Sequence, residues 1–219
     1  MPAVYAQWRR PLAPHWAIEA GARVENVAYD YANRMIDGNT DEDGLPCPGG
    51  CLYSRPADRT DDFTNFAPRL GIVWRPVESI SAWLAMARGF RAPETMEQYR
   101  LQRQQSVAEL DSEQVDELEL GLRWRCATAG LDLAAFTMDK QNVILRDSAG
   151  FNVSGGRTRH RVLEYDFDWD FAKQWTIALR LTNLRDAAYA DRADFAFGSD
   201  RYFPGRGRAV FVELGWRKD

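Results

Sequence analysis

The sequence predicts an all-β chain that forms an antiparallel up-and-down transmembrane β-barrel of about 8–10 strands, with short periplasmic turns and long extracellular loops. Three observations predict this class. Long segments alternate between apolar and polar residues, their connections are alternately short and long, and the tryptophans stand beside the short turns. Successive side chains of a strand point to opposite faces, so the alternation gives each strand one apolar and one polar face.

The alternation predicts strands at 3–11, 15–34, 63–75, 79–91, 113–127, 130–145, 152–172, 175–185 and 206–217. The pattern is clearest where Leu163, Tyr165 and Phe167 are interleaved with acidic residues. Most of these segments reach the roughly 9–11 residues that a tilted membrane strand needs. One long loop is expected to carry a short surface helix, because residues 94–110 include good helix formers without Gly or Pro.

The tryptophans all lie close to short turns. An indole has a large apolar body and one N–H, so it prefers the boundary between hydrocarbon and water. We therefore predict a membrane-interface belt of Trp8, Trp16, Trp74, Trp83, Trp124, Trp169, Trp175 and Trp216. The alternative is a soluble β-sandwich, either an enzyme or a lectin, whose strands also alternate. Long strands and tryptophans gathered at one end favour the membrane barrel.

The composition of the chain argues against two classes of protein, helical membrane proteins and nucleic-acid-binding proteins. A chain of 219 residues with 45% hydrophobic and 27% charged residues suits one β domain, 1–219, and is too polar for a helical membrane protein. It has no apolar run of about 18 residues that could form a transmembrane helix. The net charge of −4 argues against nucleic acid as a partner. No signal peptide is visible at Met1, so we expect that one was removed or that the chain is a piece of a longer protein.

The loop at 35–62 carries two further candidates. Cys47 and Cys51 enclose a short polar segment and are predicted to form a disulfide, with two free thiols as the alternative. Oxygen-bearing side chains at every second position resemble the first half of a calcium loop. The candidate Ca²⁺ ligands are Asp37, Asn39, Asp41 and Asp43. The closing Glu of such a loop is absent, and a solvated acidic loop is the more common alternative. Apart from this candidate Ca²⁺ site, we expect no cofactor.

Several segments carry a family resemblance. The run Arg88-Gly89-Phe90-Arg91-Ala92-Pro93, followed by Glu94 and by Leu110 three residues before Glu113, is the most specific of them. Supporting segments are Phe66 to Gly71, Glu113 to Gly121, and Asn183 to Asp186 with Tyr189. Over nearly its whole length the chain resembles the C-terminal barrel of TonB-dependent outer-membrane receptors. The resemblance implies a plugged barrel of about 22 strands that imports ferric siderophores or other scarce nutrients, driven by the TonB complex.

The chain also departs from that family pattern. No plug domain precedes the barrel, no TonB-contacting box is visible near Met1, and the seam between Ala172 and Leu181 is abrupt. We therefore expect a shortened C-terminal part, with an internal deletion as one explanation of the seam. TonB is expected as a partner only if a plug is encoded elsewhere.

Closure of the predicted sheet poses a topological problem. Nine strands cannot close antiparallel throughout, and an open edge in lipid leaves backbone polar groups unsatisfied. We therefore expect eight strands to close, with the segment 3–11 partly outside the barrel. The acidic residues of 164–170 would then form a polar lumen wall, paired with arginines such as Arg123, Arg125, Arg23 and Arg180.

Arginines gather in the predicted outer loops. Guanidinium groups bind carboxylates, phosphates and anionic chelates, so this clustering fits an entry vestibule for a ferric siderophore or another small chelate. The candidate ligand-binding residues are Arg91, Tyr99, Arg100, Arg103, Arg157, Arg159 and His160. The alternative is that these arginines contact lipopolysaccharide phosphates or pair with acidic residues of the same loops.

No catalytic set emerges, because the spacing of Ser154, His160 and Asp166 has no geometric meaning. We do not expect an enzyme. By resemblance we expect a receptor or transporter barrel in the bacterial outer membrane, with outer-membrane lipid and lipopolysaccharide as further partners. The alternative is a small structural or ligand-binding outer-membrane barrel without transport.

Overall fold

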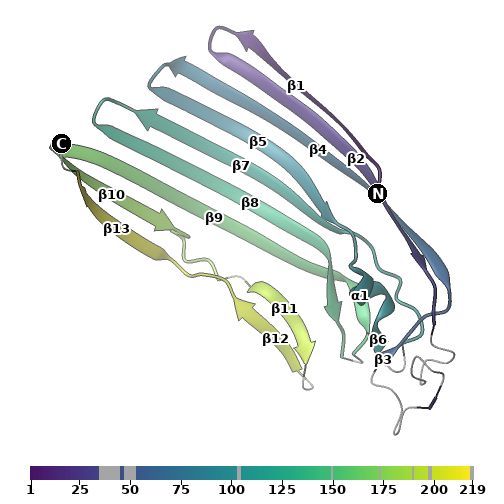
Figure 1. The fold of residues 1–219 in the computed structure, drawn as a ribbon. Helices are drawn as coiled ribbons and strands as arrows, with labels where there is room; N and C mark the ends of the chain where they lie inside the picture. Colours follow the sequence, from purple (N-terminus) through teal and green to yellow (C-terminus); the bar gives the residue numbers. More distant parts are fainter. Residues whose placement is uncertain are drawn as a thin grey trace.

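A single antiparallel sheet dominates the structure, a computed structural model that describes residues 1–34, 45–46, 53–102, 105–148, 150–172, 174–188, 190–196 and 199–217. The sheet has nine strands in the order β1-β2-β4-β5-β7-β8-β9-β10-β13 (Figure 1). Their bounds are β1 Ala3–Ala13, β2 Trp16–Tyr31, β4 Arg59–Val77, β5 Ile80–Arg91, β7 Glu113–Arg125, β8 Ala129–Arg146, β9 Asn152–Ala172, β10 Trp175–Thr182 and β13 Ala209–Trp216. Each predicted strand is therefore confirmed, with ends that differ by a few residues.

Short turns gather at one end of this sheet and long connections at the other, as predicted (Figure 1). The hairpins β1–β2, β4–β5, β7–β8 and β9–β10 turn within a few residues, for example between Ala172 and Trp175. The long connections carry small elements of their own: β3 Tyr53–Ser54, α1 Thr95–Tyr99, β6 Leu101–Gln102, β11 Ala190–Ala196 and β12 Ser199–Pro204. β3 pairs with β6, and β11 pairs with β12.

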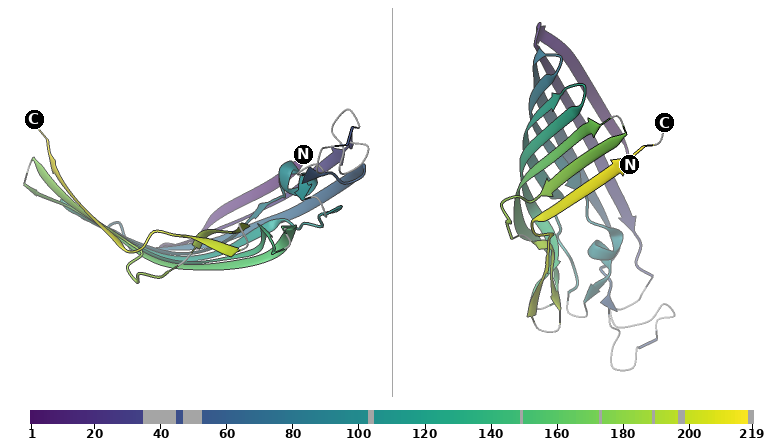
Figure 2. Two further views of the ribbon diagram at one scale, coloured as in Figure 1. Left: turned by 90° about the horizontal axis from the view of Figure 1, so that it is seen from below. Right: turned by 90° about the vertical axis from the view of Figure 1, so that its left-hand side faces the viewer.

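The sheet is open, so the expected closure of eight strands was wrong. β1 is a full member that pairs with β2 from Ala3 to Ala13, and β1 and β13 are the two edges of the sheet that the structure describes. Neighbouring strands alternate in direction, so the first and ninth strands run the same way and could not pair antiparallel. Figure 2 shows the sheet as a shallow trough with α1 on its concave side, which is an arc of a wide cylinder and not a tight barrel.

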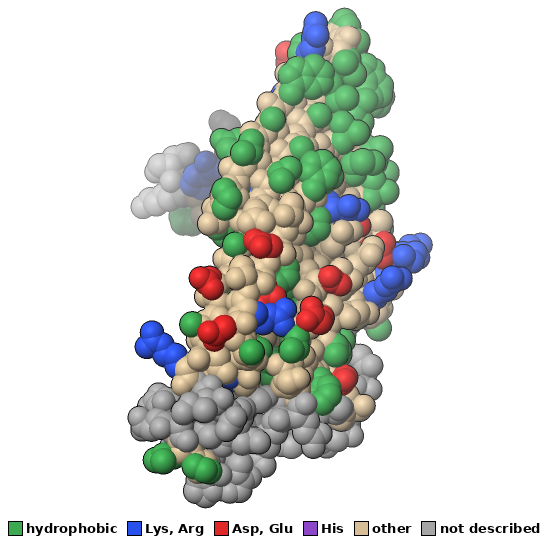
Figure 3. All heavy atoms as spheres, turned by 90° about the vertical axis from the view of Figure 1, so that its right-hand side faces the viewer, with side chains coloured by type: hydrophobic (Ala, Val, Ile, Leu, Met, Phe, Trp, Pro, Cys, Tyr) green, Lys and Arg blue, Asp and Glu red, His purple; other side chains and the backbone are tan. Residues whose placement is uncertain are grey.

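The convex face of the sheet, here called the outer face, is apolar toward the short-turn end. On β7 it presents Leu118, Leu120 and Leu122, and Leu120 is 58% exposed. On β13 it presents Leu214, which is 61% exposed. Figure 3 shows hydrophobic side chains over the upper part of the molecule and charged ones below them. The outer apolar residues thus do not pack together in a compact core, which excludes a closed soluble sandwich for the described residues.

The concave inner face is polar, and its charges pair between neighbouring strands. Arg180 Nε lies 2.6 Å from Asp166, Arg123 Nε lies 2.8 Å from Asp132, and Arg125 also contacts Asp132. The predicted polar wall is therefore present, and Arg180 pairs with one of its acidic residues as expected, whereas Arg123 and Arg125 pair with Asp132 of β8 instead. Arg23 pairs instead with Glu25 of its own strand, 2.7 Å away. Exposed pairs of this kind each contribute about 1 kcal/mol or less.

The predicted helix is present but much shorter than the segment 94–110. It begins at a capping box, in which the Glu97 carboxylate accepts the Glu94 backbone N–H at 2.8 Å. It ends at Tyr99 because Leu101 enters β6, where its side chain is fully buried. Tyr99 is 5% exposed and Met96 is 58% exposed, so α1 packs one side toward the sheet and leaves the other at the surface. None of the described helices is long and apolar enough to cross a membrane.

The tryptophans divide between the two faces. On the outer face at the short-turn end the Trp16 and Trp74 rings lie 5.8 Å apart and the Trp175 and Trp216 rings 6.5 Å apart. Trp124 and Trp169 share this face and this end, whereas Trp8 pairs with Ala20, deeper in the sheet.

Trp83 departs from the predicted belt, because it lies on the inner face. Its partner across the sheet is Gly121, and its indole N–H donates to Glu119. In β5 the even positions face outward and Trp83 is at an odd one, so strand alternation is the reason. That the other indoles lie at a membrane interface stays a prediction.

Candidate functional site

A folded connection covers part of the concave face at the long-loop end. It consists of α1, β6 and residues 105–112, and is called the strap below. Its small core is made by Leu101, Ala108 and Leu110, packed against Ile144 of β8. Burial of these apolar side chains fixes the path of a connection that would otherwise be loose.

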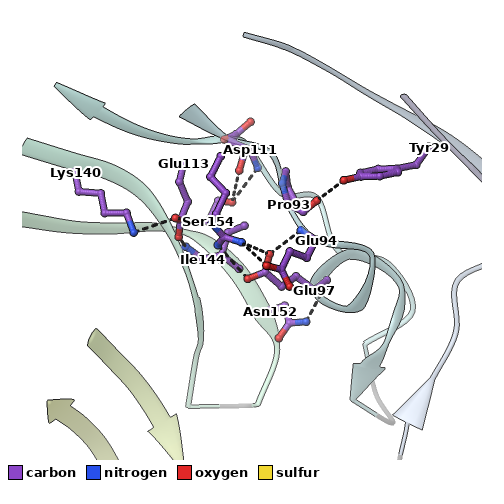
Figure 4. Close-up of polar contacts among 11 residues, drawn as sticks. Tyr29, Pro93, Glu94, Glu97, Asp111, Glu113, Lys140, Ile144, Asn152 and Ser154 are labelled. Carbon is purple, nitrogen blue, oxygen red and sulfur yellow. Dashed lines mark hydrogen bonds and ion pairs between the residues drawn. The ribbon is translucent and has the colours of Figure 1, made fainter. Parts of the chain in front are cut away.

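Glu113, the first residue of β7, joins the strap to the sheet (Figure 4). Its side chain is 4% exposed and its carboxylate accepts three hydrogen bonds. The donors are Arg91 Nε at 2.9 Å, the Ile144 backbone N–H at 2.9 Å and Lys140 Nζ at 3.0 Å. Arg91 also forms a double hydrogen bond with Glu97 of α1, at 2.9 and 3.0 Å. Arg91 therefore bridges two carboxylates, one on the helix and one on the sheet.

The same contacts set the protonation of Glu113, which lies beyond the apolar part of β7 and outside any membrane-spanning segment. Burial by itself raises the pKa of the carboxyl group, but the bonds from Arg91, the Ile144 N–H and Lys140 stabilise the carboxylate more. The net effect lowers the pKa of Glu113 to about 2. The residue is therefore an anion at neutral pH and not a proton donor.

A second anchor surrounds Asp61 of β4. The Tyr99 hydroxyl donates to Asp61 at 2.8 Å, and Arg59 Nε donates to the same carboxylate at 2.9 Å. Gln98 Nε2 donates to the Ala108 carbonyl at 2.8 Å and holds the two halves of the strap together. Burial, and then the bond to Asp61, raise the pKa of Tyr99, so its hydroxyl stays protonated and remains a donor.

A third anchor ties the strap to β9. The Asn152 backbone N–H donates to the Gln105 side-chain oxygen, and Gln105 Nε2 donates back to the Asn152 carbonyl, both at 2.9 Å. Asn152 Nδ2 also donates to the Glu97 carbonyl at 2.7 Å (Figure 4). Four strands, β5, β7, β8 and β9, and the helix thus converge on one polar cluster, which makes the strap a rigid part of the inner face.

A pocket of about 630 Å³ lies between this strap and the end of β2. It is lined by Ala28, Tyr29, Asp30, Tyr31, Arg55, Thr95, Met96, Tyr99 and Arg100. The Tyr31 and Tyr99 rings stack at 4.3 Å with an interplanar angle of 6°, and the Tyr29 hydroxyl donates to the Pro93 carbonyl at 2.9 Å. Flat aromatic walls beside two guanidinium groups suit a planar or aromatic anion.

The structure gathers only part of the predicted ligand set. Tyr99 and Arg100 line the pocket, whereas Arg91 is engaged by its two carboxylates, and Arg103 lies outside the described residues.

The predicted residues on β9 do not converge. Arg157 and Arg159 point to the outer face, whereas His160 points inward, where its Nε2 lies 3.3 Å from the Thr158 hydroxyl. Arg157 and Arg159 therefore cannot form one site with the inner pocket, because successive strand residues face opposite sides, and His160, although inward, is not among the residues that line the pocket.

Sequence reasoning missed Tyr29, Tyr31 and Arg55. Two tyrosines at alternate positions near the end of a strand were a usable signal for the first two, since they share a face. Arg55 carried no such signal, because its place depends on the β3–β6 pairing. The predicted Ca²⁺ ligands Asp37, Asn39, Asp41 and Asp43 and the predicted disulfide of Cys47 and Cys51 lie outside the described residues. Within the described ranges, no group of three or more His, Cys, Asp or Glu side chains is placed to hold a metal ion.

Comparison with known proteins identifies the architecture. The family model "TonB dependent receptor-like, beta-barrel" matches residues 2–219. The siderophore receptor PiuA of Acinetobacter baumannii matches 98% of this chain with a TM-score of 0.64 and 13% identity, over 30% of its own length. The hemophore receptor HasR of Serratia marcescens matches 99% with a TM-score of 0.64 and 18% identity, over 41% of its length.

The import receptor Fiu of E. coli K12 matches 98% of the chain with a TM-score of 0.52 and 12% identity, over 44% of its length. The chain therefore spans less than half the length of these three receptors, and the low identities indicate a shared fold alone. Barrels of this family are outer-membrane receptors and transporters of bacteria. The match of the family model over residues 2–219 places this chain in the TonB-dependent receptor-like β-barrel family.

Proposed function

We propose that this chain forms part of the wall of an outer-membrane receptor that takes up an anionic metal chelate of the ferric siderophore class. The observation that carries the proposal is the pocket beside the strap, at the long-loop end of the inner face. Among the matched structures, one is described as a ferric-catecholate import receptor and another as a siderophore receptor. These descriptions agree with the chemistry of the pocket.

The two faces of the sheet support a membrane location. The outer face presents exposed leucines and paired tryptophans toward the short turns, and the inner face presents ion pairs. A sheet with an apolar outer band and a polar interior is the arrangement of outer-membrane barrels. In this orientation the short turns face the periplasm, and the pocket faces the outside of the cell.

The open edges require partners in the membrane. Unpaired backbone N–H and C=O groups of β1 and β13 would each cost several kcal/mol in hydrocarbon. Because β1 and β13 run in the same direction, antiparallel closure needs an odd number of additional strands between them. A second copy of this nine-stranded sheet would give an even number of strands. However, β13 of one copy would lie beside β1 of the other in the same direction, so the two copies could pair only through parallel strands. We therefore assign the missing strands, and the TonB-driven plug, to other parts of a larger receptor.

The pocket has the chemistry of a chelate-binding rim. Arg55 and Arg100 supply positive charge, and the stacked Tyr31 and Tyr99 rings supply a flat wall. A hydrogen bond to a charged partner contributes about 1.5–3 kcal/mol. Two guanidinium groups would together contribute about 3–6 kcal/mol to the binding of an anionic chelate.

Binding to outer membranes tests the proposal. Membranes from cells that express the protein are titrated with ferric tris-catecholate, ferric citrate and haem, and the bound iron is measured. We expect one of these probes to bind, and Arg55→Ala with Arg100→Ala to weaken it at least tenfold. Arg185→Ala removes an exposed arginine of the same end outside the pocket and should leave binding unchanged.

Two results would contradict the proposal. The first is a protein that is recovered in the soluble fraction without detergent. The second is a protein in the outer membrane that binds none of the probes, or binds them equally in both variants. The second result would favour the alternative, a structural barrel section without transport.

A further inference from the structure

The outer face of β9 changes character along its length. From the short-turn end it presents Phe171, Trp169, Phe167, Tyr165 and Leu163, as its pairing with β8 and β10 shows. The next three outward positions are Arg161, Arg159 and Arg157. The switch from apolar to basic is complete between Leu163 and Arg161. Alternate strand residues lie about 7 Å apart, so the three arginines form one row along the outer face.

The arginine row is accessible. All three residues are exposed, and the Arg159 side chain is 60% exposed although its Nε donates to Asp139 of β8. Among the described residues, no salt bridge involves Arg157 or Arg161. The row therefore carries a net positive charge.

The same boundary appears on the neighbouring strands. On β7 the outward residue that follows Leu118 is Asp116, which pairs with Arg88 of β5 at 2.5 Å. On β8 the corresponding position is Asp139. The apolar band thus ends within one outward position across β5, β7, β8 and β9, since Arg161 lies opposite Thr137 and Thr137 opposite Leu118. An excess of positive charge lies on β9.

We propose that Arg157, Arg159 and Arg161 bind the phosphate groups of lipids in the outer leaflet, with lipid A of lipopolysaccharide as the occupant. This inference rests on the membrane orientation proposed above. A side chain directly beyond the apolar band lies at the level of lipid headgroups, where phosphates are the anions. Guanidinium groups form paired hydrogen bonds with phosphate oxygens, and three in a row can engage more than one phosphate of the same headgroup.

The outward direction of the row decides between occupants. A chelate bound for import would meet the inner face, where the pocket of Tyr99 and Arg100 lies, and the row points to the opposite side. Free phosphate has no apolar part, so it would gain nothing from the adjacent Leu163 and Tyr165. A phosphorylated lipid places its acyl chains against this apolar surface and its phosphates against the arginines, which satisfies both parts of the face.

Lipid binding to the purified full protein tests the inference. The protein is placed in phosphatidylcholine nanodiscs and titrated with bisphosphorylated lipid A, with lipid A that lacks one phosphate, and with inorganic phosphate. Each basic side chain near an anionic headgroup contributes about fivefold in affinity. We therefore expect Arg157→Gln with Arg161→Gln to weaken lipid A binding about twentyfold. This pair of changes leaves the Arg159–Asp139 ion pair intact.

Two further variants serve as controls, one for charge and one for position. Arg157→Lys with Arg161→Lys keeps the charge and should retain most of the affinity. Arg10→Gln with Arg75→Gln removes the same charge at the opposite edge of the apolar band and should change the affinity less than twofold.

Several outcomes would overturn the inference. They are equal lipid A affinity in the Gln variant, equal weakening in the opposite-edge control, or effective competition by inorganic phosphate. These outcomes are separable from failure of the proposed function, because each of them leaves chelate binding at the inner pocket untouched. A protein that does not enter nanodiscs would instead overturn the membrane orientation itself.

Discussion

Replacement of Glu113 by Gln is expected to loosen the strap without unfolding the sheet. The carboxylate receives Arg91, Lys140 and the Ile144 N–H in a position that is 4% exposed. Removal of one partner of a buried ion pair costs about 3–5 kcal/mol. Here the Arg91 and Lys140 side chains are 39% and 35% exposed, so water partly replaces the lost partner. We therefore expect a loss of about 2 kcal/mol in local stability.

Hydrogen exchange followed by mass spectrometry measures this loss in the protein in detergent micelles. Because about 1.4 kcal/mol corresponds to a factor of ten, amides of the strap and of residues 140–146 should exchange about 30-fold faster. Amides of residues 118–124, in the apolar part of β7, should exchange as in the unmodified protein. Faster exchange confined to the strap and residues 140–146 would identify Glu113 as the main polar anchor of the strap.

Glu109→Gln is the matched control. It removes one carboxylate from the strap itself, but the Glu109 side chain is 82% exposed and lies 3.6 Å from Arg59. The expected change is below about 0.5 kcal/mol, or less than threefold in exchange rate. If Glu113→Gln changed exchange no more than this control, or if both accelerated the whole sheet, the assignment of Glu113 as the anchor would be wrong.

The remaining predictions concern pH and packing. Because the folded pKa of Glu113 is lowered from 4.5 to about 2, its contribution is fully present above pH 4.5 and is lost as the pH falls toward 2. Strap protection, measured by hydrogen exchange corrected for intrinsic rates, should follow this window, and Glu113→Gln should remove the dependence. Tyr99→Phe keeps the ring but loses the bond to Asp61, so α1 should lose about 1 kcal/mol of protection; unchanged exchange would count against this bond. Gly121→Ala places a Cβ in the Trp83 ring, so urea unfolding in micelles should show a loss of about 1–3 kcal/mol, and an unchanged midpoint would contradict this packing.

The sheet could be predicted from the sequence because alternation is a local property. Each strand shows its two faces in its own residues, as in the run from Leu163 to Phe171, so neither pairing nor curvature is needed to recognise it. The same rule could have placed Trp83 on the inner face, since it stands at an odd position among outward even ones. The rule also separates Arg159 from His160, which the predicted ligand set had combined.

The strap and the pocket could not be predicted in this way. Glu113 meets Arg91 across 22 positions of sequence, and Asp61 meets Tyr99 across 38. Helix propensity favoured a helix over most of 94–110, but burial of Leu101 and the β3–β6 pairing ended it at Tyr99. Interactions between distant segments outweighed local preference, because each buried contact contributes more free energy than the difference in propensity.

The sequence by itself determined which residues form the nine strands of the main sheet, which face of each strand is apolar, and at which end the chain turns tightly, but it did not indicate the small strands β3, β6, β11 and β12. Only the tertiary structure decided that the sheet stays open and that the strap covers its concave side. The physical reason is the sequence separation of the residues that interact. Strand alternation depends on adjacent residues. Curvature, closure and convergence depend on register and packing among strands that are far apart in the chain.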